Sequence, residues 1–211
     1  METVGGDVVG VVLAGGLSRR MGGGDKGLLD LAGASLIARV IERLRPQVGA
    51  MVVNANGDPA RLARFGLPIA PDATADFAGP LSGVLAGMAW AREHRPAARW
   101  VATAACDTPF FPETFVADCL AAVGERHTAI ALAASSDGAH PVFGLWPTAL
   151  AGDLERALER GVRKVLDWTN AHPTVEVRFG PVVLPGGHAD PFFNANTPAD
   201  LAEAERLLRG V

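Results

Sequence analysis

The segment from residue 11 to residue 33 holds the highest concentration of groups able to bind an anion. It reads VVLAGGLSRRMGGGDKGLLDLAG and carries seven glycines together with Arg19, Arg20 and Lys26. Glycine lets the backbone approach a bound phosphate closely, and arginine and lysine supply charged donors. The combination predicts a triphosphate-binding loop, whereas the glycines alone would also suit a solvated surface loop.

Two standard phosphate loops do not match this segment. Gly22, Gly24 and Gly27 spell G-x-G-x-x-G, but a dinucleotide-binding turn begins directly at the strand end, and this one starts eight residues late. A Walker A loop requires Gly-Lys-Ser/Thr, whereas Lys26 lies between Asp25 and Gly27. With both standard loops excluded, the remaining candidate for an anion site is the backbone of Ala14, Gly15 and Gly16 together with the cationic side chains that follow it.

Asp107 is the candidate metal ligand. It follows the apolar run Trp100–Ala105 and so lies at the carboxyl end of a predicted strand. An open α/β sheet binds its ligand at that end. One carboxylate with triphosphate oxygens and waters is sufficient for Mg²⁺. The alternative is a turn residue or helix cap at Thr108-Pro109.

Asn54 and Asp72 also follow predicted strands. A carboxylate can accept together from N1–H and N2–H₂ of guanine, a pair of donors that cytosine does not offer. Asp72 is therefore a candidate for choosing the base, and a contact with the ribose is the alternative.

Three further segments have weaker signals. Gly79-Pro80-Leu81-Ser82-Gly83 begins a helix whose free N–H groups favour anions or polar base edges. Asn194 and Asn196 precede a capping box at Thr197–Asp200, so they either bind substrate or form an ordinary Asx turn. Arg163-Lys164 is either a phosphate partner or a solvated helix start.

Alternating apolar segments predict the elements that position these groups. Strands are expected at Val8–Leu13, Ala50–Val53, Pro68–Ala70, Trp100–Ala105, Thr128–Ala133 and Pro141–Trp146. Helices are expected at Leu36–Leu44, Pro59–Phe65, Leu81–Glu93, Glu113–Val123 and from Pro198 onward. The last two strands suggest an antiparallel pair at one edge, and residues 180–191 read as a connector. This order predicts an α/β three-layer sandwich with a mostly parallel mixed sheet, as a single domain over residues 1–211.

Composition excludes several classes of protein. The chain is 49% apolar and carries a formal charge of −4 with no basic tail, so we expect no nucleic-acid polymer as partner. The apolar run Val8–Leu13 is too short to cross a membrane, and no membrane partner is expected. Two cysteines outside any C-x-x-C spacing favour a reducing, cytoplasmic location.

The segment LAGGLSRRMGGGDKGLL resembles the signature of nucleotidyltransferases that activate small molecules with nucleoside triphosphates. With VVNAN (52–56), PD (71–72), GPLSG (79–83), CDTPF (106–110) and NANTP (194–198), nearly the whole chain resembles the molybdenum cofactor guanylyltransferase branch. Relatives often carry valine where this chain has Ala195, which bears only on pocket shape.

The resemblance implies a Rossmann-like nucleotidyltransferase fold and a Mg²⁺-dependent transfer of GMP from GTP to molybdopterin, which forms molybdopterin guanine dinucleotide and releases pyrophosphate. It implies catalytic roles for Lys26 and Asp107, with the metal on Asp107. It further implies substrate contacts at Leu13, Ala14, Gly15, Gly16, Arg20, Lys26, Asn54, Asp72, Gly83, Asp107, Asn194 and Asn196. Transient contact with proteins that supply molybdopterin or mature molybdoenzymes would follow.

Two alternatives stay open at the level of sequence. The first is a CTP-dependent cytidylyltransferase acting on molybdopterin or on another small phosphate acceptor, such as a polyol phosphate. The second is a regulatory module that binds a nucleotide without turnover. Lys26 and Asp107 argue against the second, because a binder has no need of a metal carboxylate beside a triphosphate loop.

Overall fold

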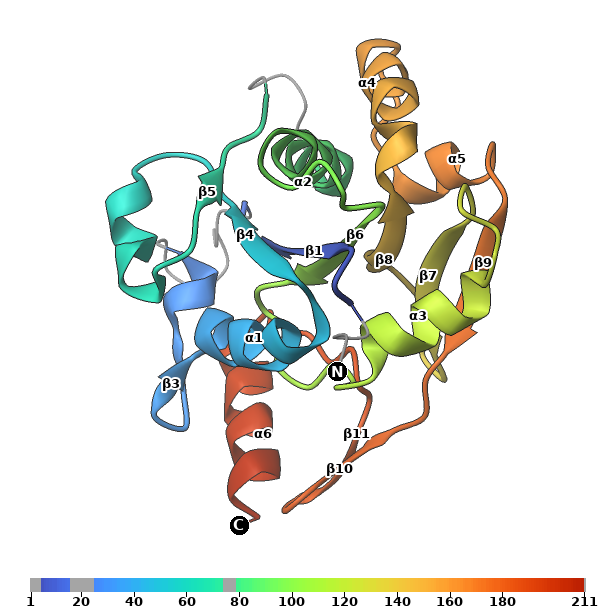
Figure 1. Cartoon of the computed structure of the whole chain (residues 1–211). Helices are drawn as coiled ribbons and strands as arrows, with labels where there is room; N and C mark the ends of the chain where they lie inside the picture. The colour runs from blue at the N-terminus through green and yellow to red at the C-terminus, as the bar shows by residue number, and fades with distance from the viewer. Residues whose placement is uncertain (1–4, 16–24, 74–78, 211) are drawn as a thin grey trace.

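A seven-stranded sheet forms the centre of the computed structural model, which describes residues 5–15, 25–73 and 79–210. The strand order is β5-β4-β1-β6-β8-β7-β9 (Figure 1). The strands are β1 (Val8–Leu13), β4 (Ala50–Asn54), β5 (Ile69–Ala70), β6 (Trp100–Ala105), β7 (Ile130–Ser135), β8 (Gly138–Pro147) and β9 (Thr174–Arg178). Strand β8 is antiparallel to both neighbours, and the remaining pairings of this sheet are parallel. The predicted mostly parallel mixed sheet is confirmed.

Helices cover both faces of the sheet and complete a three-layer sandwich. One face packs against α1 (Leu36–Leu44) and α3 (Phe115–Val123), and the other against α2 (Pro80–His94), α4 (Ala151–Glu159) and α5 (Val165–Thr169) (Figure 1). Helix α1 forms where its apolar residues fall on a single stripe that faces the sheet. The predicted architecture is confirmed.

Several short elements accompany the sandwich and the last helix, α6 (Pro198–Arg209). They comprise the hairpins β2 (Asp30–Leu31) with β3 (Ala34–Ser35) and β10 (Val182–Leu184) with β11 (Gly187–Ala189), and the 3₁₀ helices η1 (Lys26–Leu28), η2 (Arg45–Gln47), η3 (Pro59–Phe65) and η4 (Thr148–Leu150). Leu207 of α6 shares a small buried cluster with Phe110, which lies just after β6. This cluster brings the C-terminal segment to the carboxyl end of β6.

Three expectations about this topology need correction. The β7–β8 pair is antiparallel as expected, but the sheet edge is β9, whose five-residue alternation Thr-Val-Glu-Val-Arg is a weak signal. Residues 180–191 contain the β10–β11 hairpin in place of a plain connector. Helices α4 and α5 were not expected, although Leu154, Ala157 and Leu158 give α4 a helical stripe.

The strand register places the candidate residues at one edge of the sheet. Leu13 at the end of β1 pairs with Asn54 on one side and with Ala105 on the other, and Asn54 pairs in turn with Ala70. Parallel strands end together, so residues that follow them meet at that edge.

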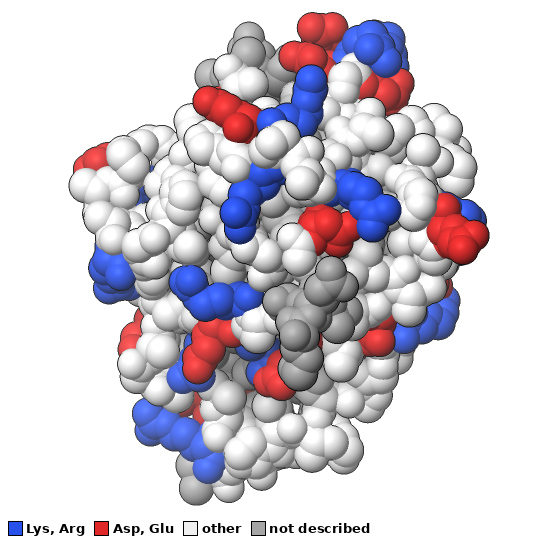
Figure 2. All heavy atoms as spheres, in the orientation of Figure 1, with Lys and Arg blue, Asp and Glu red and all other residues white. Residues whose placement is uncertain are grey.

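On the face drawn in Figure 2, acidic and basic side chains are interspersed over the described residues. Within the described part of the chain, no helix combines the length and the apolar character required to cross a bilayer.

Helix α2 packs so closely on β1 that Gly87 has no room for a side chain. A Cβ at residue 87 would lie 2.4 Å from Cγ2 of Val11. We therefore expect Gly87→Ala to lower the free energy of unfolding by about 1–3 kcal/mol, because the helix must shift away from the sheet. Urea denaturation measures this change.

Gly152 of α4 is the matched control. A Cβ there would meet only the Arg156 side chain, at 3.6 Å, so Gly152→Ala should keep or raise stability by up to about 1 kcal/mol. Equal losses in the two variants would contradict the close approach of α2 to β1.

Candidate active site

A cavity of about 410 Å³ lies at the carboxyl ends of β1, β4 and β6. It is lined by Leu13, Gly15, Lys26, Asn54, Asn56, Asp72, Gly79, Pro80, Ala105, Cys106, Asp107 and Val142. The sequence-predicted residues Leu13, Gly15, Lys26, Asn54, Asp72 and Asp107 therefore meet in one cavity. Gly16 and Arg20 lie outside the described residues.

Lys26 and Asp107 form an ion pair in this cavity. The Lys26 ammonium lies 2.5 Å from Oδ2 of Asp107, and it also donates to Oδ1 of Asn196. The two side chains are only 12% and 20% exposed, respectively. A mostly buried charge is costly without a partner, so each side chain offsets the cost of burying the other.

The loop before α6 is tied to Asp107 through its asparagines. The Thr108 hydroxyl donates to Oδ1 of Asn194 (2.6 Å), and the backbone N–H of Ala195 donates to the Asp107 carbonyl (3.0 Å). The prediction of a role for Asn194 and Asn196 thus gains a geometric basis, because Lys26 and Thr108 hold both amides beside Asp107. Both asparagines are exposed, and neither lines the cavity itself.

The predicted capping box fixes the same loop at the start of α6. Oδ2 of Asp200 accepts from the backbone N–H groups of Asn196 (2.8 Å) and Thr197 (2.7 Å). Partial burial raises the pKa of Asp200, but hydrogen bonds from Thr197 and Asn196 and the charge of Lys26 outweigh it, so the pKa lies below its ordinary value. Asp200 therefore stays ionised and keeps Asn196 in place.

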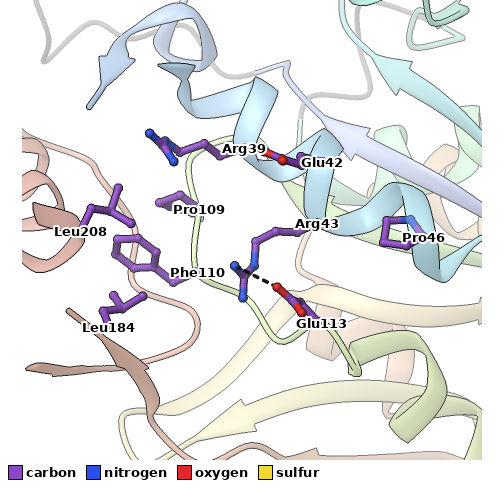
Figure 3. Close-up of a pocket in the computed structure, with 9 residues that line it drawn as sticks. All are labelled: Arg39, Glu42, Arg43, Pro46, Pro109, Phe110, Glu113, Leu184 and Leu208. Atoms are coloured by element: carbon purple, nitrogen blue, oxygen red, sulfur yellow. Dashed lines mark ion pairs between the residues drawn. The ribbon is translucent and has the colours of Figure 1, made fainter. Parts of the chain in front are cut away.

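Helix α1 braces the other end of the Asp107 loop, as Figure 3 shows around a second cavity of about 340 Å³. Arg43 points to Glu113 with 3.6 Å between the charged groups, and its Nε donates to the Phe111 carbonyl (2.8 Å). Gln47 donates to the Pro112 carbonyl (3.1 Å) and accepts from the backbone N–H of Val116. The end of the loop between β6 and α3 is thus bound to α1 and to η2.

The Asp72 carboxylate is held by two asparagines. Asn54 donates to Oδ1 of Asp72 (2.9 Å) and Asn56 donates to Oδ2 (2.8 Å). Sequence reasoning named Asn54 and Asp72 but missed Asn56, although the N-x-N spacing after β4 was a usable signal.

Asn54 is buried, and its position explains Gly83. Its amide also donates to the Ala70 carbonyl (3.0 Å), and a Cβ on Gly83 would come within 2.5 Å of its Oδ1. Gly83 thus makes room for Asn54 behind the cavity lining. The backbone N–H of Ala14 donates to the Asn54 carbonyl (2.8 Å), which extends the β1–β4 ladder to the start of the glycine-rich loop.

Cys106 lines the cavity next to Asp107 but is not suited to nucleophilic chemistry. Burial raises the pKa of its thiol, and the charges of Asp107 and Asp25 act in the same direction. A thiol that stays protonated is a poor nucleophile, so Cys106 serves as packing.

The backbone of Arg163 lies near Gly79, which lines the cavity, and Lys164 follows it in the chain. The Arg163 carbonyl is 3.7 Å from the position that a Cβ on Gly79 would take. The Arg163 guanidinium donates to the carbonyls of Leu158 and Val162, and Lys164 is the exposed N-cap residue of α5.

The donor set of the cavity fits a divalent cation that brings most of its own ligands. Within the described residues there is no group of three or more His, Cys, Asp or Glu side chains. Asp107 provides one hard carboxylate at the cavity wall, and Mg²⁺ commonly takes one or two carboxylates together with phosphate oxygens and waters.

Thr108 offers a test of how the Asn194 loop is held. Thr108→Val removes a fully buried hydroxyl and leaves the Asn194 amide oxygen without that donor, so we expect a loss of about 1–3 kcal/mol in the free energy of unfolding. Thr148→Val is the control, because that hydroxyl is partly exposed at η4. Urea denaturation should show a clearly smaller loss for the control, and equal losses would contradict the role of Thr108.

Comparisons with known proteins identify the family of the chain. Residues 10–175 match the model of the MobA-like NTP transferase domain. The chain is 52% identical over 201 residues to a molybdenum cofactor guanylyltransferase of Bradyrhizobium sp. (strain ORS 278), covering 95% of this chain and 92% of that one. It is 52% identical over 198 residues to the same-named protein of Rhodopseudomonas palustris (strain BisB5), covering 93% and 92%.

A solved structure shows the same fold. Molybdopterin-guanine dinucleotide biosynthesis protein A from Archaeoglobus fulgidus aligns over 94% of this chain and 97% of its own, with a TM-score of 0.69 and 26% identity. The family model covers most of the chain and the relatives cover nearly all of it. The chain therefore belongs to the MobA-like NTP transferase family.

Proposed function

We propose that this chain transfers GMP from GTP to the terminal phosphate of molybdopterin, and that residues 1–211 act as one domain in the cytoplasm. The observation that carries the activity is the single cavity in which the Lys26–Asp107 pair, the Asp72 carboxylate and the Gly15 backbone meet. The names of the close relatives supply the acceptor and the guanine nucleotide.

In the proposed reaction an oxygen of the molybdopterin phosphate forms a bond to the α-phosphorus of GTP. The bond between the α-phosphorus and the bridging oxygen to the β-phosphate breaks, and pyrophosphate leaves with that electron pair. The acceptor is already an anion near neutral pH, so the reaction needs no general base and no covalent intermediate on the protein. The protein supplies alignment and charge neutralisation.

Each member of the Lys26–Asp107 pair would gain a new partner of opposite charge when substrate binds. Lys26 would exchange the Asp107 carboxylate for triphosphate oxygens, and Asp107 would exchange the ammonium for a divalent cation. Mg²⁺ bound at Asp107 would neutralise the charge on the triphosphate and on the leaving pyrophosphate. Each new partner would carry the same sign of charge as the partner that it replaces. Neither side chain would then be left without a counter-charge in the mostly buried site.

The remaining residues are assigned by their positions. The backbone of Leu13, Ala14 and Gly15 would contact phosphate and ribose, and Gly16 and Arg20 are proposed to continue that contact. Asn194 and Asn196 would orient the Lys26–Asp107 pair. Arg163 and Lys164 are proposed to meet the acceptor phosphate. Proteins that supply molybdopterin or receive the product are the proposed transient partners.

The direct experiment is a nucleotide panel. The purified chain is incubated with Mg²⁺, molybdopterin and each nucleoside triphosphate in turn, and pyrophosphate is measured. Release with GTP alone supports the proposal. Release with CTP alone would identify a cytidylyltransferase, and no release with any nucleotide would indicate a binding module and overturn it.

Lys26 gives the sharpest single substitution. We expect Lys26→Ala to lower kcat/KM for GTP by about 10²–10³-fold, because it removes the ammonium that stabilises the developing phosphate charge. Steady-state pyrophosphate release measures the change. Arg92→Ala, an exposed cation on α2, is the control and should stay within about twofold of the unmodified chain, since screened surface charges contribute little. A similar rate for both variants would remove Lys26 from the mechanism.

A further inference from the structure

Asn56 and Asp72 form a closed hydrogen-bonded pair at the mouth of the cavity. The Asn56 amide donates to Oδ2 of Asp72 (2.8 Å), and its Oδ1 accepts from the backbone N–H of Asp72 (2.9 Å). Two bonds between the same residues fix both the position and the rotation of the Asp72 side chain. The Asn54 amide donates to the other carboxylate oxygen, Oδ1 (2.9 Å).

This arrangement leaves Asp72 able to accept a matched pair of donors. An ionised carboxylate has about four acceptor sites, two on each oxygen. The asparagine amides occupy one site on Oδ1 and one on Oδ2. One further site on each oxygen is left, and both Asp72 and Asn56 line the cavity that holds Lys26 and Asp107.

Two adjacent acceptors in one plane suit a ligand edge that offers two adjacent donors. The Watson–Crick edge of guanine offers N1–H beside N2–H₂, whereas hypoxanthine keeps N1–H but lacks the amino group. Cytosine presents acceptors at N3 and O2, which a carboxylate would repel. An aligned Asp72 would therefore distinguish guanine from both bases.

We propose that Asn56 is a specificity-determining positioning residue, which orients the Asp72 carboxylate so that both of its oxygens accept from guanine. The inference rests on the proposed function, because it takes GTP as the donor. It assigns Asn56 a role in base choice and none in the transfer of the phosphoryl group, which depends on Lys26 and Asp107.

A purely structural role for Asn56 makes a different prediction. In that case its bonds to Asp72 would only tie the turn after β4 to the segment after β5, and their loss would affect all nucleotides alike. Asn56 is exposed, whereas Asn54 is buried against Gly83. A substitution at Asn56 therefore preserves the packing of the sheet edge, whereas a substitution at Asn54 would disturb it.

The test compares kcat/KM for GTP and for ITP, which carries hypoxanthine, in the unmodified chain and in Asn56→Ala. We expect the unmodified chain to prefer GTP by about tenfold or more, because ITP leaves one acceptor of Asp72 unpaired. In Asn56→Ala the GTP/ITP ratio should fall by about tenfold, through a higher KM for GTP with kcat unchanged. Asn56→Asp should lower GTP use further, since two carboxylates would then repel each other.

Asn170→Ala is the matched control, because Asn170 is an exposed asparagine at the C-cap of α5. Its GTP/ITP ratio should equal that of the unmodified chain. The urea midpoint of each variant confirms that it is folded, and Asn56→Ser provides a milder second variant.

The outcomes separate this inference from the proposed function. An unmodified chain that uses GTP and ITP equally, or an Asn56→Ala variant that loses both in proportion, overturns the inference while guanylyl transfer stands. A changed preference between GTP and 2′-deoxy-GTP with an unchanged GTP/ITP ratio would assign Asp72 to the ribose and also overturn it. Failure of the unmodified chain to use GTP at all would instead overturn the proposed function.

Discussion

The contact between the Lys26 ammonium and the Asp107 carboxylate is the interaction on which the arrangement of the site depends. The two residues are 81 positions apart, and a third segment 170 positions from Lys26 adds the Asn196 amide to the same ammonium. Each of these two mostly buried charges offsets the cost of burying the other. In the proposed mechanism the triphosphate replaces Asp107 as the partner of Lys26, and the divalent cation replaces Lys26 as the partner of Asp107. Each side chain thus keeps a partner of opposite charge when substrate binds.

The rest of the fold keeps these three segments in register. The parallel ladders of β1, β4 and β6 bring Leu13, Asn54 and Ala105 to one edge. Arg43 on α1 and Gln47 on η2 hold the loop that follows Asp107, and Asp200 in the first turn of α6 holds the backbone beside Asn196. Charge neutralisation requires placement to within a fraction of an ångström, which rigid elements provide better than free loops.

Much of the sandwich was predictable because its strands are continuous apolar runs. Val8–Leu13 and Trp100–Ala105 were predicted with the bounds that the structure has. The edge strand β9 and the β10–β11 hairpin were missed, because short strands with exposed, alternating residues look like connectors in sequence. At the site, strand ends and motifs identified Lys26, Asp72 and Asp107. The N-x-N spacing was a usable signal for Asn56, but the roles of Asn56 and Thr108 come from bonds to residues 16 and 86 positions away, which only the structure shows.

The central claim is that Asp107 exchanges Lys26 for a divalent cation when the nucleotide binds. Calorimetric titration of GTP with and without Mg²⁺, into the unmodified chain and into Asp107→Asn, tests it most directly. The account predicts that Mg²⁺ strengthens GTP binding by about tenfold or more in the unmodified chain and by much less in the variant, which keeps the size of the side chain but not its charge. An equal effect of Mg²⁺ on both proteins would contradict it.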